Sequence, residues 1–173
     1  MKKFKYCLIL VFFISSSIFS QKKYIRTIAL PTEAEKLLNQ EFQEWDYFNS
    51  PIPFSDSTEV CSAWLYADII KGDFNNDSYI DYAALIKPHD FKNGFLILFL
   101  SEQGAYRLIK FKEVNYYKDQ VLFLARKGSA LYDFESDRTF VLPIDAITLA
   151  TYEKGGISYY MSKGKFVEVI TSD

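Results

Sequence analysis

Histidine and cysteine are scarce in this chain of 173 residues, which has one histidine, His89, and two cysteines, Cys7 and Cys61. The sequence contains no CxxC pair, no HExxH motif and no glycine-rich phosphate loop. A zinc site needs several nitrogen or sulfur ligands, and a serine hydrolase needs a histidine base beside its nucleophile. The composition therefore argues against both classes of enzyme.

Clusters of basic residues are also missing. The chain has 20 lysine and arginine residues against 22 aspartate and glutamate residues, and the basic ones occur at most as short pairs after the first few positions. A protein whose main partner is nucleic acid or an anionic membrane needs a basic surface, so we expect neither partner. The apolar fraction of 49% and the charged fraction of 24% are typical of a globular protein rather than a disordered or fibrous one.

Residues 1–20 have the order of segments found in a secretory signal peptide. Three lysines lie within the first five residues, an apolar run from Tyr6 to Ile14 follows, and small polar residues come next. This run is too short to span a bilayer comfortably, although an uncleaved signal anchor is the alternative. We expect cleavage, export to the periplasm or outside the cell, and no stable membrane insertion afterwards. Loss of the three lysines leaves 17 basic and 22 acidic residues, a net charge of −5.

Cleavage would also remove Cys7 and leave Cys61 as the single cysteine. A lone thiol in an exported protein is buried, pairs with another chain or reacts. The apolar neighbours of Cys61 between Val60 and Trp64 favour burial. A catalytic thiol would need an activating base, and His89 lies in a polar, turn-like stretch.

A helical pattern runs from Thr32 to about Asn49. Apolar residues recur there at steps of three and four, and charged or amide side chains fall between them. The apolar positions are Ala34, Leu37, Leu38, Phe42, Trp45 and Phe48. Thr32 and Glu35 have the spacing of a capping box, and Pro51 and Pro53 end the pattern.

After Asp68 the pattern changes to short runs of β-branched and aromatic residues, which predict strands. The runs cover residues 79–87, 94–101, 105–111, 121–125, 130–134, 146–153, 157–161 and 166–170. Glycine-containing turns at residues 101–104, 154–156 and 162–164 indicate adjacent antiparallel strands. We therefore expect a single α+β domain over residues 21–173, with one N-terminal helix packed on an antiparallel β-sheet or meander.

The segment with the clearest chemistry is residues 72–82, where oxygen-bearing side chains stand at alternate positions. The candidate metal ligands are Asp73, Asn75, Asp77, Asp81 and the main-chain carbonyl of Tyr79. Such positions of a tight loop point inward and can converge on one hard cation. Calcium suits them best, because it prefers six to eight oxygen ligands and tolerates irregular geometry. The alternative is an ordinary turn of aspartate and asparagine residues, held by their own side chains.

The stretch from Gly72 to Ala84, GDFNNDSYIDYAA, resembles the calcium loop of FG-GAP and VCBS repeats, the type found in integrin-α propellers. The resemblance implies a calcium loop followed by a short apolar strand. A propeller is not implied, because the chain has one copy of the loop and propellers need several blades. Ala84 stands where an EF-hand has its closing acid, so a calcium sensor of that type is excluded. Ser78 replaces the expected glycine, and a positive φ there would cost about 1 kcal/mol.

More loosely, the chain is similar to small exported single-domain bacterial proteins of unknown function. Those proteins have a short helix ending near a tryptophan, one such calcium loop and a closing hairpin. Leu30 to Trp45 matches the helix, and Ser158 to Phe166 matches the hairpin, with Met161 where tryptophan is more usual. This resemblance bears on the fold and implies no activity.

We interpret the chain as an exported, non-enzymatic binding or interaction domain with a structural calcium loop and an unidentified protein or glycan partner. The alternative is a periplasmic inhibitor or immunity-type protein, whose acidic surface blocks a toxin or an envelope hydrolase. A third hypothesis is an enzyme that cleaves envelope polysaccharide with paired acids from residues 41–46 or 133–137. Acids at these spacings are typical of solvated faces, so this hypothesis has the least support.

Overall fold

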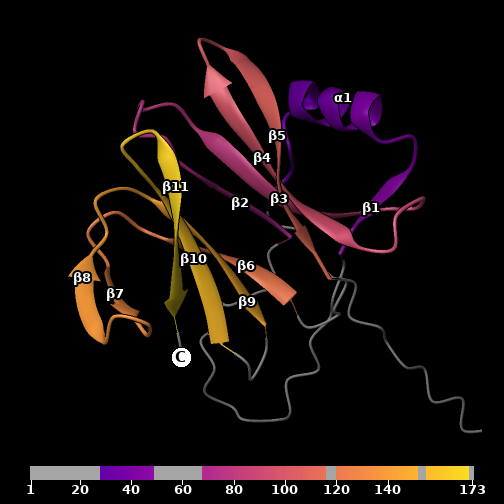
Figure 1. The fold of residues 1–173 in the computed structure, drawn as a ribbon. Coiled ribbons are helices and arrows are strands. Elements are labelled where there is room, and N and C mark those ends of the chain that lie inside the picture. Colours follow the sequence, from indigo (N-terminus) through magenta and orange to yellow (C-terminus); the bar gives the residue numbers. More distant parts are fainter. Residues whose placement is uncertain (1–27, 49–67, 116–119, 152–154, 172–173) are drawn as a thin grey trace, which may run out of the picture.

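The computed structural model describes residues 28–48, 68–115, 120–151 and 155–171 (Figure 1). These residues contain one helix and eleven strands, and all strand pairs are antiparallel. The predicted combination of one helix with antiparallel strands is confirmed. The predicted signal peptide, Cys61 and the two prolines predicted to end the helix lie outside the described residues. In the part of the chain that is described, no helix is long and apolar enough to cross a bilayer.

The first sheet has five strands, with the order β1–β3–β4–β5 and with β2 also paired to β3. Its strands are β1 (Trp45–Tyr47), β2 (Ile69–Gly72), β3 (Asp81–Pro88), β4 (Gly94–Glu102) and β5 (Ala105–Val114). The central strands β3 and β4 are almost entirely buried. A strand buried on both faces loses the alternation of apolar and polar residues and becomes a nearly continuous apolar run.

The second sheet has the order β11–β10–β9–β6, and β7 and β8 form a separate hairpin. These strands are β6 (Gln120–Ala125), β7 (Ala130–Asp133), β8 (Arg138–Val141), β9 (Ala146–Thr151), β10 (Gly155–Ser162) and β11 (Lys165–Thr171). The hairpin lies beside β11. The main-chain N–H of Phe134, in the turn between β7 and β8, donates to the carbonyl of Ile170 in β11. Two larger sheets are thus present where the sequence pattern predicted one.

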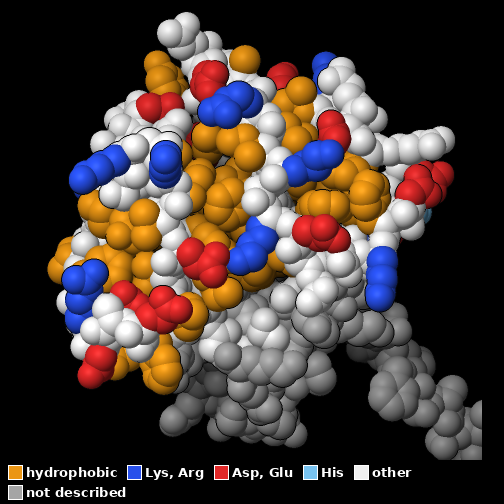
Figure 2. Space-filling view, in the orientation of Figure 1, with side chains coloured by type: hydrophobic (Ala, Val, Ile, Leu, Met, Phe, Trp, Pro, Cys, Tyr) orange, Lys and Arg blue, Asp and Glu red, His pale blue; other side chains and the backbone are white. Residues whose placement is uncertain are grey.

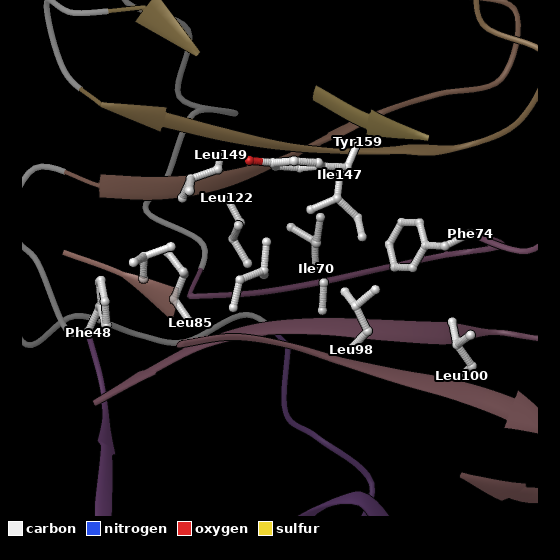
Figure 3. Packing of buried hydrophobic residues seen from close by; sticks show 13 residues of the cluster. Phe48, Ile70, Phe74, Leu85, Leu98, Leu100, Leu122, Ile147, Leu149 and Tyr159 are labelled. Atoms are coloured by element: carbon white, nitrogen blue, oxygen red, sulfur yellow. The ribbon is translucent and has the colours of Figure 1, made fainter. Parts of the chain in front are cut away.

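The main hydrophobic core fills the space between the two larger sheets. Leu85 and Leu98 of the first sheet face Leu122 and Leu149 of the second, as Figure 3 shows. Tyr159 of β10 belongs to the same cluster and is also buried. The two sheets therefore form a sandwich whose inner side chains are packed face to face.

The helix α1 (Thr32–Glu41) lies against the other face of the first sheet. Ala34 and Leu38 are fully buried and share a hydrophobic cluster with Ile86, Ile97 and Phe99. Successive residues of a strand point to opposite faces, so β3 and β4 contribute to both cores. The helix, the first sheet and the second sheet form three layers.

The helix is shorter than predicted, because it ends at Glu41 and not near Asn49. Phe42 is already extended, with φ −128° and ψ 128°, and Trp45 begins a strand that pairs with β3. Phe42 packs in the cluster beneath the helix, whereas Phe48 packs in the core between the sheets. The chain must therefore pass from one face of the first sheet to the other between these two residues, which a continuous helix cannot do.

The predicted capping box is also wrong. Thr32 is the first helical residue, and Pro31 occupies the cap position without a hydrogen bond from a side chain. The N–H of Glu35 donates to the carbonyl of Pro31 as the first bond of the helical ladder. The proline ring fixes φ of Pro31 at −59°, close to the helical value, so the first turn forms without the threonine side chain.

Candidate metal centre

The predicted metal-binding segment, residues 72–82, includes the whole connection between β2 and β3, which is residues 73–80. The ring of Phe74 is fully buried in the core between the two sheets, where Figure 3 shows it beside Ile147. The main-chain N–H of Asp73 donates to Oδ2 of Asp145, 3.3 Å away, directly before β9. The loop is therefore attached to both sheets.

Three of the predicted ligands come together at the exposed tip of this loop. The main-chain N–H of Asp77 donates to Oδ1 of Asp73 and to Oδ1 of Asn75, each at 3.1 Å. The second oxygen of Asp73 accepts from the N–H of Ser78 at 3.0 Å, and Oδ1 of Asp77 accepts from the N–H of Tyr79 at 2.8 Å. These hydrogen bonds arrange the side chains of Asp73, Asn75 and Asp77 around one small volume.

Asp81 is placed differently, at the start of β3 and fully buried. Its Oδ2 accepts from the N–H of Phe74 and its Oδ1 accepts from the N–H of Ser101, both at 2.8 Å. Burial, with a smaller effect from the charges of Asp77 and Asp73, raises the pKa of its carboxyl to about 6, although these two hydrogen bonds lower it. The side chain thus connects the loop to the end of β4, a role that the sequence pattern did not reveal.

The donor set at the tip fits a hard cation. All the side-chain acceptors are oxygens, and an oxygen that accepts one N–H keeps a further lone pair for a metal. Among the described residues, no three histidine, cysteine or acidic side chains gather as a metal-binding group. Asp73 and Asp77 would therefore be assisted by Asn75 and by the carbonyl of Tyr79, and the role of Asp81 as a ligand stays a prediction. If a cation binds there, so few protein ligands predict weak binding, because affinity rises with the number of charged ligands.

The backbone of the loop is strained at one residue. Ser78 has φ +69° and Asn76 has φ +62°. Asparagine tolerates this left-handed conformation, whereas a serine there costs about 1 kcal/mol. From the sequence we expect Ser78 to weaken the loop if this position has a positive φ. The structure has that positive φ, which a glycine adopts freely.

Two basic residues that sequence reasoning missed lie beside the loop. Nζ of Lys127 is 3.5 Å from Oδ1 of Asn76, and the main-chain N–H of Lys127 donates to Oδ1 of Asp145 at 2.9 Å. The guanidinium of Arg126 is 3.6 Å from Oδ2 of Asp145. Arg126, Lys127 and Asp145 are at least 44 positions away from the loop in the sequence, and no local signal links them to it. The positive charges of Arg126 and Lys127 make the electrostatic potential at the loop less negative.

The acids of residues 41–46, which the sequence offered as a catalytic pair, lie outside the loop and contact other side chains. Oε1 of Glu41 is 2.6 Å from Nζ of Lys110 in an exposed ion pair. Glu44 and Asp46 each lie beside the ring of His89, on opposite sides of it. These three acids face basic groups rather than one another, unlike the paired carboxylates of a glycoside hydrolase.

Comparison of the chain with models of protein families, with curated proteins and with solved structures gave no match. The likeness to FG-GAP and VCBS repeats therefore stays a resemblance of one short segment. The hydrogen bonds among Asp73, Asn75 and Asp77, including one of 2.8 Å from Nδ2 of Asn75 to Oδ2 of Asp77, are those of a turn held by its own side chains, and calcium binding there stays a prediction.

Proposed function

We propose that this protein is an exported, non-enzymatic binding domain in which calcium stabilises the loop of residues 72–82. The observation that carries this proposal is that side-chain oxygens of Asp73 and Asn75 meet at the N–H of Asp77, on a loop attached to both sheets. Calcium bound there would neutralise carboxylates that otherwise repel one another. The ion would hold the connection between β2 and β3 and, through Asp73 and Asp145, would stabilise the sandwich.

The partner that we propose is a protein or a glycan outside the cytoplasm. The signal-like residues 1–20 support export. Figure 2 shows acidic and basic side chains interspersed over one face of the protein. A mixed surface of this kind suits a protein or a glycan better than nucleic acid, whose phosphates select a basic face.

Thermal unfolding of the purified protein in chelator and in calcium tests the proposal. Calcium at about ten times its dissociation constant, roughly 1–5 mM for a weak extracellular site, adds about 1.4 kcal/mol of stability. The expected rise in melting temperature is about 3–6 °C for a domain of this size. The same concentration of magnesium serves as the control for general ionic effects.

Two variants locate the effect. Asp77→Ala removes a carboxylate from the tip of the loop and should abolish the rise caused by calcium. Asp90→Ala removes an exposed acid from the connection between β3 and β4 and should retain it. An undiminished rise in Asp77→Ala would show that any calcium site lies elsewhere.

A further inference from the structure

His89, the only histidine of the chain, lies between two carboxylates. Its Nδ1 is 3.0 Å from Oε2 of Glu44, and its Nε2 is 2.9 Å from Oδ2 of Asp46. A neutral imidazole has one N–H and can donate to only one of these oxygens, whereas the imidazolium donates to both. The geometry is therefore complementary to the charged ring.

This cluster joins two neighbouring segments at the edge of the first sheet. Glu44 directly precedes β1 and Asp46 is the middle residue of β1, whereas His89 directly follows β3. β1 has only three residues, and its first, Trp45, is opposite Pro88, which has no N–H to donate. The main-chain N–H of His89 donates to the carbonyl of Glu44 at 3.0 Å. The ring of His89 thus adds two contacts to a very short strand pairing.

β1 is also the connection between the two hydrophobic clusters. It follows Phe42, which is buried beneath the helix, and precedes Phe48, which is buried between the sheets. The N–H of Phe48 donates to the carbonyl of Leu85 in β3 at 3.4 Å, so the end of β1 is held by a long bond. A weaker contact between β1 and β3 would loosen the attachment of the helical segment to the sheet.

We propose that His89 is a pH-sensitive clip, which fastens β1 to the end of β3 through Glu44 and Asp46 when the ring is protonated and loses one of these contacts when it is neutral. Other charged groups nearby make different contacts. Lys87, opposite Asp46 in the strand register, donates from Nζ to the carbonyls of Pro88 and Phe91. Asp90 and Lys92 follow in the same connection and are exposed.

The direction of the pH effect follows from the contacts. Hydrogen bonds to Asp46 and then to Glu44 raise the pKa of His89 above its ordinary value of 6.5. A histidine with a raised pKa in the folded state contributes stability that is fully present below the unfolded pKa and is lost as the pH rises through the folded pKa. The clip is therefore closed in mildly acidic conditions and opens as the pH rises above the raised pKa.

An NMR titration of the ring tests the clip directly, because a chain with one histidine gives one set of ring signals. We expect a pKa above 6.5 in the unchanged protein, a lower pKa in Glu44→Gln and in Asp46→Asn, and a return to the ordinary value when both changes are combined. Glu102→Gln is the matched control, since that acid forms an exposed ion pair with Arg107 at the other end of the sheet. A pKa at or below 6.5 in the unchanged protein, or one that neither variant moves, would overturn the proposal.

Amide hydrogen exchange tests the consequence for the strand. The protection of the amides of Phe48 and His89, measured relative to amides of β4, should fall roughly two- to fivefold between about pH 5.5 and pH 8.5, the range expected for an exposed charged contact. In His89→Gln this relative protection should be the same at both pH values. Equal relative protection at both pH values in the unchanged protein would show that His89 does not control the pairing.

Discussion

The main-chain N–H of Asp73 donates a hydrogen bond to Oδ2 of Asp145, 3.3 Å away, and so joins the two sheets. Asp73 begins the candidate calcium loop of the first sheet, and Asp145 directly precedes β9 in the second. The other oxygen of Asp145 accepts from the N–H of Lys127 in the turn after β6. One carboxylate therefore connects the loop to two segments of the second sheet, and a cation that orders the loop acts on the whole sandwich.

Phe74 anchors the loop in the core. Its ring is fully buried between the sheets, so Phe74→Ala should lower the free energy of unfolding by about 3–5 kcal/mol. Phe134→Ala is the matched control, because that ring is 61% exposed, and the change should stay within about 0.5 kcal/mol. Denaturant unfolding of both variants measures the difference. Equal losses would mean that Phe74 is not buried between the sheets.

Asp81 should matter for stability even without calcium. Asp81→Ala leaves the buried N–H groups of Phe74 and Ser101 without their acceptor, which should cost about 2–4 kcal/mol in chelator. Asp77→Ala, at the exposed tip, should cost less than about 1 kcal/mol under the same conditions. The account of Asp81 as a structural link fails if the two variants unfold at the same denaturant concentration.

Ser78→Gly should stabilise the protein. The left-handed backbone at Ser78, with φ +69°, is relieved by glycine, and the expected gain is about 1 kcal/mol. Calcium binding should also become tighter, because the loop then adopts its geometry without strain. Ser129→Gly is the control, since Ser129 does not have a positive φ and a glycine there only adds freedom to the unfolded chain. A loss of stability in Ser78→Gly would contradict the claim that the backbone at Ser78 is strained.

Gly94 tests the path of the chain after the helix. A Cβ at Gly94 would overlap the ring of Phe48 and lie 2.7 Å from the carbonyl oxygen of Ile86. Gly94→Ala should therefore destabilise the protein by about 1–3 kcal/mol. Gly156→Ala, where the nearest atom is 3.3 Å away, should be tolerated better. If Gly94→Ala were as stable as the unchanged protein, Phe48 would not pack against β4. A helix continuing to Asn49 would predict that result.

Local signals in the sequence predicted the local parts of the fold. The apolar spacing identified the helix up to Glu41, and the turns at residues 101–104 and 162–164 identified two hairpins. Gln103 with Gly104 and Lys163 with Gly164 have the positive φ values that two-residue hairpin turns need. The same spacing failed after Glu41, because pairing of β1 with β3 outweighs helical preference there.

The division into two sheets could not be predicted for a physical reason. β3 and β4 are buried on both faces, so their residues carry no alternation that assigns one face to the helix and the other to the second sheet. The tip of the loop could be predicted, since Asp73, Asn75 and Asp77 lie within five residues. Asp145 and Ser101 reach the loop only through strand packing, which a single sequence does not specify.

A calcium titration followed through the backbone amide signals of the purified protein tests the central claim most directly. The account predicts shifts concentrated at residues 72–82 and at Asp145 and Lys127, with saturation at about millimolar calcium and no comparable change with magnesium. Absence of shifts in residues 72–82, or shifts concentrated at another acidic segment such as residues 44–46, would contradict a calcium site in this loop.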